Sequence, residues 1–136
     1  MKATFPFVFT QGNLTEIVEA FTKEGAATLM QLNHGDTMGG FEYNCVKTFD
    51  AILLRIKSTN AGKLTGIEFV KTDGSKRKTS FNPLWTYKAK GTGRPLSSDR
   101  FMFLESFNSK DQKPKTISLY KDKVVKFKIN KQEVYL

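Results

Sequence analysis

Alternation of apolar and polar side chains predicts that the second half of the chain forms short β-strands. Asp73-Gly74 is the strongest hairpin dipeptide in the sequence, and we expect the runs on either side of it to pair. Asp122-Lys123 is expected to close a second hairpin between its neighbouring strands. The predicted strands cover residues 64–72, 75–81, 84–89, 101–107, 116–121, 124–130 and 131–136.

One amphipathic helix is predicted over about residues 14–24. Asn13 is a suitable N-cap, Glu16 completes a capping-box spacing, and Gly25 supplies a stop. The apolar residues recur at helical spacing and form one stripe: Leu14, Ile17, Val18 and Phe21. Because the outer face is acidic, we expect this helix to cover a sheet rather than to contact nucleic acid.

The other segments of the first half are predicted as strands. Residues 3–9 are aromatic and β-prone, but Pro6 cannot donate to a ladder, and an edge strand or an extended arm is expected there. Residues 27–33 are compatible with a strand, and residues 41–47 alternate as a half-buried strand does. Residues 48–58 fit both a helix and a strand. The strand is favoured because a β-meander is expected to follow.

Together these elements predict a single domain over residues 1–136. The expected fold is α+β, mainly β, with a curved antiparallel sheet or small barrel-like β-meander carrying the helix. A chain of 136 residues with 39% apolar residues and 12 Phe is large enough to bury its own core.

Several classes of protein are excluded by the composition. One Cys and one His allow neither an internal disulfide nor a closed zinc site, and no cofactor is predicted. No apolar run has the length of a membrane helix, and the first residues lack the features of a signal peptide. We therefore expect no membrane partner and a cytoplasmic location, in a bacterial cell or a virus-infected host.

Positive charge is concentrated in one part of the chain, whose formal net charge is +9. Residues 1–54 hold three basic and six acidic residues, whereas residues 55–136 hold 19 basic and seven acidic residues. A strongly basic segment indicates a polyanionic partner, of which DNA or RNA is the first candidate. A solubilising surface explains the same charge without any partner.

Two segments contain candidate nucleic-acid contacts. The hairpin 64–81 presents cations around a tight turn, where they can lie along a phosphate backbone, and alternation places Lys76 and Lys78 on the face opposite Arg77. Residues 85–101 interleave aromatic rings with cations, as single-strand binders do. The candidate contacts are Lys71, Lys76, Arg77, Lys78, Trp85, Tyr87, Lys88, Lys90, Arg94 and Arg100.

Each of these segments also has a purely structural explanation. Lysines on an edge strand prevent sheets from pairing, and core packing accounts for Trp85. Lys126 and Lys128 have the spacing of the solvated face of an amphipathic edge strand. Cys45 and His34 match no nucleophile motif, and Cys45 is expected to be a buried inert thiol.

The sequence therefore predicts a non-catalytic nucleic-acid-binding protein that holds the phosphate backbone on a basic, aromatic-containing sheet face. Such a face could bind either a single strand or a duplex recognised by its shape, and the sequence does not distinguish DNA from RNA. The alternative is a small structural or assembly protein, such as a virion component or a homo-oligomer, or an inhibitor of a protein partner. A short Phe- and Lys-rich chain is also typical of viral and mobile-element proteins.

Overall fold

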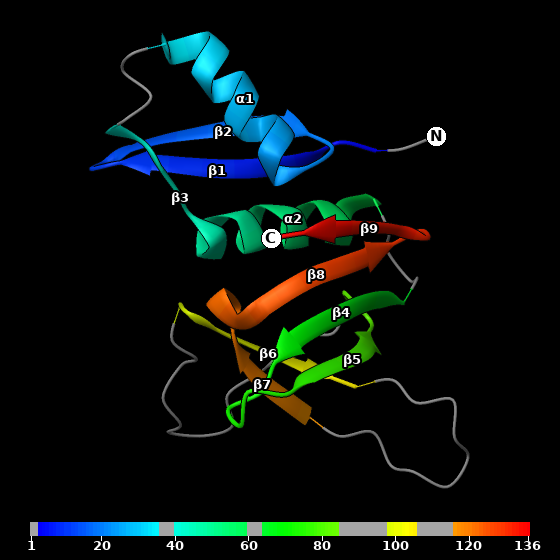
Figure 1. The fold of residues 1–136 in the computed structure, drawn as a ribbon. Helices are drawn as coiled ribbons and strands as arrows, with labels where there is room; N and C mark the ends of the chain where they lie inside the picture. Colours follow the sequence, from blue (N-terminus) through cyan, green and yellow to red (C-terminus); the bar gives the residue numbers. More distant parts are fainter. Residues whose placement is uncertain (1–2, 36–39, 60–63, 85–97, 106–115) are drawn as a thin grey trace, which may run out of the picture.

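Three antiparallel sheets and two helices form the part of the protein that the computed structural model describes, which is residues 3–35, 40–59, 64–84, 98–105 and 116–136. None of the three sheets closes into a barrel. The predicted α+β, mainly β class is thus confirmed. The one predicted helix is wrong, however, and the two observed helices lie mainly in segments that were predicted as strands. Figure 1 shows α1, the first sheet, α2 and the remaining strands following one another as layers.

The helix expected at residues 14–24 is wrong, because residues 14–20 form a strand and a helix begins only at Lys23. The first sheet has the order β2-β1-β3, with β1 (Phe5–Gln11), β2 (Leu14–Ala20) and β3 (Glu42–Tyr43). Gly12, at φ 59°, is the first residue of a two-residue turn between β1 and β2. The pairing of the two strands begins at Gln11 and Leu14 and ends at Phe5 and Ala20. A Gly-Asn pair between two β-prone runs is itself a hairpin signal, and here it outweighs the helical spacing.

The edge position expected for residues 3–9 is also corrected. β1 is the central strand of its sheet, and its residues are buried from Phe5 to Phe9. β3 pairs only with Phe9 and Thr10 of β1. Among the described residues, Pro6 therefore has a neighbouring strand on one side only, and its missing N–H costs no hydrogen bond to a second strand.

The first helix, α1 (Lys23–His34), occupies the segment predicted as a strand at 27–33. Thr22 caps it, since the Thr22 side chain accepts a hydrogen bond from the Gly25 N–H at 2.9 Å. Ala26 and Met30, four residues apart, are its buried side chains. α1 lies over one face of the first sheet (Figure 1).

The second helix, α2 (Cys45–Thr59), overturns the favoured strand at 48–58 and shortens the predicted strand at 41–47 to β3. Asn44 is the cap that sequence reasoning missed: its Oδ1 accepts from the Lys47 N–H at 3.0 Å. The inward side chains have helical spacing: Phe49, Ile52, Leu53 and Ile56. α2 lies under the first sheet, between it and the other strands (Figure 1).

A buried threonine joins α2 to β1. Thr48 is fully buried, and its Oγ1 accepts from the Val8 N–H at 2.9 Å while donating to the Asn44 carbonyl at 2.8 Å. The Asn44 N–H in turn donates to the Val8 carbonyl at 2.9 Å. These bonds give partners to the Val8 N–H and carbonyl, which lie just beyond the short pairing of β1 with β3.

The remaining strands form two further sheets. The Asp73-Gly74 hairpin is confirmed, with Val70 opposite Lys76. The second expected hairpin is wrong, because the strands flanking Asp122-Lys123 belong to different sheets and are joined by the short 3-10 turn η2 (Lys121–Lys123). The second sheet has the order β5-β4-β8-β9, with β4 (Thr65–Val70), β5 (Lys76–Phe81), β8 (Val124–Ile129) and β9 (Gln132–Tyr135). The third sheet pairs β6 (Arg100–Leu104) with β7 (Thr116–Tyr120).

A cluster of phenylalanine rings holds the second and third sheets to α2. Phe101 and Phe103 share one face of β6, as the alternation predicted, while Phe107 lies outside the described residues. The ring centroids in the cluster lie 5.1–6.4 Å apart. Its members are Phe49, Phe69, Phe81, Phe101, Phe103 and Phe127. The cluster fixes the position of β7 relative to the β4–β5 hairpin.

Candidate nucleic-acid interface

A groove of about 700 Å³ lies between the end of the β4–β5 hairpin and strand β7. Four cations line this groove, and no acidic side chain lines it within the described part of the chain. We call it the basic groove and define it by Lys71, Arg77, Arg100, Tyr120 and Lys123. Three predicted contacts therefore line one groove: Lys71 from the hairpin turn, Arg77 from β5 and Arg100 from β6.

The hairpin turn holds Lys71 at one end of the groove. The Lys71 N–H donates to the Ser75 carbonyl at 2.8 Å, and the Gly74 N–H donates to the Lys71 carbonyl at 2.9 Å. Asp73 accepts from the Ser75 N–H at 2.9 Å and from its hydroxyl at 2.6 Å, which lowers the pKa of the Asp73 carboxyl. Because the turn makes these hydrogen bonds within itself, the backbone that carries Lys71 is held in place.

Arg77 has a partner that sequence reasoning did not foresee. Its Nη2 donates to both carboxylate oxygens of Glu105, at 2.7 and 2.6 Å, and Glu105 is only 1% exposed. Glu105 immediately follows β6 and forms an isolated bridge with Phe81 of β5. The ion pair thus connects the second and third sheets and balances much of the positive charge of Arg77.

Arg100 and Tyr120 form a second fixed unit in the groove. They are opposite each other in the β6–β7 ladder, and the Arg100 guanidinium carbon lies 4.8 Å from the centre of the Tyr120 ring. Arg100 Nη2 also donates to the Ser118 hydroxyl at 2.6 Å. Tyr120 is 43% exposed. The alternation of residues 116–121 already places Tyr120 on the polar face with Ser118, which is the signal that would have identified it.

Lys123 completes the basic groove from the 3-10 turn between β7 and β8. It is exposed and forms no salt bridge within 4 Å with any described residue. Its neighbour Lys121 is different, since its Nζ lies 2.6 Å from Asp50 of α2. Charge in sequence alone does not separate these two lysines.

Lys76 and Lys78 do not join the basic groove. In the ladder Lys76 pairs with Val70 and Lys78 pairs with Glu68. Both lysines point to the outer face of the second sheet, and Arg77 points to the other face, as the alternation predicted. That face also carries acidic groups, because Glu68 and Glu133 flank Lys126 at 3.9 and 2.9 Å.

Strand β8 is not the amphipathic edge strand that was expected. It lies between β4 and β9. The Glu133 carboxylate beside Lys126 raises the pKa of its ammonium group. Lys126 is therefore part of an ion-paired surface and is less available to a phosphate than a free lysine.

Half of the predicted contacts lie outside the described residues. These are Trp85, Tyr87, Lys88, Lys90 and Arg94. Their contribution to nucleic-acid binding stays a prediction.

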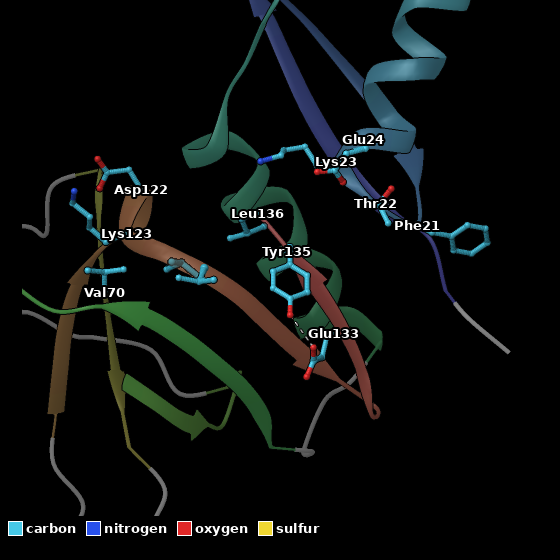
Figure 2. Close-up of a pocket in the computed structure, with 12 residues that line it drawn as sticks. Phe21, Thr22, Lys23, Glu24, Val70, Asp122, Lys123, Glu133, Tyr135 and Leu136 are labelled. Atoms are coloured by element: carbon cyan, nitrogen blue, oxygen red, sulfur yellow. Dashed lines mark hydrogen bonds between the residues drawn. The ribbon is translucent and has the colours of Figure 1, made fainter. Parts of the chain in front are cut away.

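A second hollow, of about 650 Å³, lies where the β2–α1 junction meets the second sheet (Figure 2). Its lining carries both signs of charge, in contrast with the basic groove. The ionisable side chains are Lys23, Glu24, Asp122, Lys123 and Glu133, and the Tyr135 hydroxyl donates to Glu133 at 3.1 Å. Mixed charge of this kind does not favour a polyanion.

The residues considered for other chemistry have structural surroundings. His34 Nε2 contacts the Glu16 carboxylate, and its ring centre lies 5.0 Å from that of Phe41. Cys45 is partly buried at the start of α2 rather than fully buried. Burial raises the pKa of Tyr43 to about 12. Within the described ranges, no group of three or more His, Cys, Asp or Glu residues could hold a metal ion.

None of the helices in the described part of the chain is long and apolar enough to cross a membrane.

No protein-family model matches the chain, and no curated protein or solved structure matches it.

Proposed function

We propose that the protein binds nucleic acid through the basic groove and catalyses no reaction on it. The observation that carries this proposal is the convergence of Lys71, Arg77, Arg100 and Lys123 on one groove whose described lining contains no carboxylate. Cations gathered in one concave surface attract a polyanion more strongly than the same cations scattered over a molecule.

The four cations are expected to contribute unequally. Arg77 is neutralised by Glu105, so the phosphate contacts fall mainly to Lys71, Arg100 and Lys123. Three neutralised phosphates predict a slope of roughly −2 to −3 when the logarithm of the binding constant is plotted against that of the salt concentration. A steeper slope would indicate phosphate contacts beyond the basic groove.

Matched charge reversals test the location of the site. Fluorescence anisotropy of a labelled oligonucleotide would compare Lys71→Glu/Lys123→Glu with Lys76→Glu/Lys78→Glu, which changes the net charge equally on the outer face. The groove variant is expected to lose at least about tenfold in affinity at low salt, because two attractions become repulsions. The outer-face variant is expected to lose much less. Equal losses would refute the groove as the site, and failure of the parent protein to bind would refute the function.

Self-association is a second candidate function, favoured by the exposed edge of the first sheet. Among the described residues, strand β2 has a neighbouring strand on only one side, and Leu14 and Ile17 are 62% and 57% exposed. An antiparallel edge of this kind can pair with its own copy about a two-fold axis. Light scattering coupled to gel filtration would show a dimer that Ile17→Lys disrupts and Leu32→Lys on α1 leaves intact. A monomer at all concentrations would refute this candidate.

A further inference from the structure

The shape and lining of the basic groove bear on which form of nucleic acid it could hold. Its walls are mainly the end of the β4–β5 hairpin and strand β7, and neither α1 nor α2 lines it. Its volume of about 700 Å³ lies in the range of sites that enclose a small ligand. A duplex keeps the faces of its stacked, paired bases inside, so it presents no base face to this groove. One flexible strand can enter it.

An aromatic ring lies among the cations of the groove. Tyr120 is 43% exposed, and Arg100 holds a defined position over the ring because Ser118 also accepts its Nη2 hydrogen bond. Only an unpaired base can reach such a ring with its face. Lys71 and Lys123 line the same groove, so both are available to phosphates near a stacked nucleotide.

Neutral hydrogen-bonding groups complete the lining. Thr72, Thr116 and Ser118 all carry hydroxyl groups on the groove and are exposed. A hydroxyl donates and accepts, and it can therefore pair with a base edge or a sugar oxygen without fixing one sequence. This combination of ring, cations and hydroxyls is typical of surfaces that bind single strands with little sequence preference.

We infer that the basic groove takes single-stranded nucleic acid, with a base stacked on Tyr120 and its neighbouring phosphates on Lys71 and Lys123. The inference rests on the proposed function and narrows its ligand to an unpaired strand.

The test compares strands and side chains together. Labelled probes would be single strands of DNA and of RNA, about 12 nucleotides long and unable to self-pair, and the same DNA as a duplex. The variants are Tyr120→Ala, Tyr120→Phe, which keeps the ring, and Tyr135→Ala, which removes an exposed tyrosine outside the groove. Circular dichroism and thermal unfolding would establish that each variant is folded.

The single strands are expected to bind at least about tenfold more tightly than the duplex. Tyr120→Ala is expected to lose about tenfold in single-strand affinity, within the range of base stacking on an aromatic ring, and to leave duplex affinity unchanged. Tyr120→Phe and Tyr135→Ala are expected to bind as the parent protein does. The DNA and RNA arms identify which strand is preferred.

The outcomes separate the inference from the proposed function. If neither single strands nor duplex bind at low salt, the proposed function is refuted. If the duplex binds as tightly as the single strands, or if Tyr120→Ala weakens duplex and single strands equally, the inference is overturned while nucleic-acid binding stands. If single strands are preferred but Tyr120→Ala has no effect, stacking on Tyr120 is refuted.

Discussion

The ion pair between Arg77 and Glu105 predicts an asymmetric response to mutation. Glu105 is 1% exposed, whereas the Arg77 side chain is 38% exposed and reaches it from the groove. Arg77→Met keeps the aliphatic length but leaves a buried carboxylate without the guanidinium. Glu105→Gln keeps the volume and leaves a guanidinium that water can solvate.

The two variants should differ in stability by a measurable amount. Removing one partner of a buried ion pair costs about 3–5 kcal/mol, and the exposure of Arg77 places Arg77→Met near the lower end, at about 3 kcal/mol. Glu105→Gln loses a charge-assisted bond but buries no unpaired charge, so it should cost about 1 kcal/mol. In a chain of 136 residues, a loss of about 3 kcal/mol lowers the melting temperature by roughly 10 °C.

Urea unfolding followed by circular dichroism would measure both single variants and the double variant. Arg77→Met/Glu105→Gln is expected to be more stable than Arg77→Met alone, because the second change removes the unpaired charge. Equal costs for the two single variants would refute the reasoning, as would a cost well under 1 kcal/mol for Arg77→Met. Either result would mean that water or another group already solvates Glu105.

Three further outcomes are expected. Thr48→Val removes the acceptor of the Val8 N–H, and urea unfolding should show a loss of about 1–3 kcal/mol. Arg55 holds the pKa of Glu19 below its ordinary value of 4.5, so this pair stabilises the fold above about pH 4.5 and loses that effect as the pH falls through the lowered pKa. The stability difference between the parent and Glu19→Gln should therefore be positive near neutral pH and vanish in acid. Lys131→Gly should raise the free energy of unfolding by about 1 kcal/mol, measured as a higher urea midpoint, because Lys131 has a φ of 68° that glycine adopts without strain.

Local signals in the sequence determined the β-rich second half. The Asp73-Gly74 turn and the alternation around it fixed the β4–β5 hairpin, including the separation of Lys78 from Arg77 onto opposite faces. These features depend on residues two to five positions apart, since turn chemistry and strand alternation act over that distance. The mainly β class followed from the same signals.

Tertiary pairing decided the first half. Residues 14–24 carry both a helical stripe and β-prone residues, and the hairpin with β1 selected the strand by burying Val18 and Ala20. In residues 48–58 the choice went the other way. Asn44 capped a helix, and Thr48 and Phe49 found partners in different sheets. In each segment the local signals for helix and strand competed, and only the surfaces available for packing decided between them.

The composition showed that the chain is basic, from which a polyanionic partner stays a prediction, and only the fold decided where the cations converge. Lys71, Arg100 and Lys123 are distant in sequence and line one groove because the phenylalanine cluster fixes the β4–β5 hairpin beside β7. The burial of Glu105 against Arg77 arises from the same long-range packing. Charge can be counted along a chain, but its convergence depends on contacts between segments far apart in sequence, which no local pattern contains.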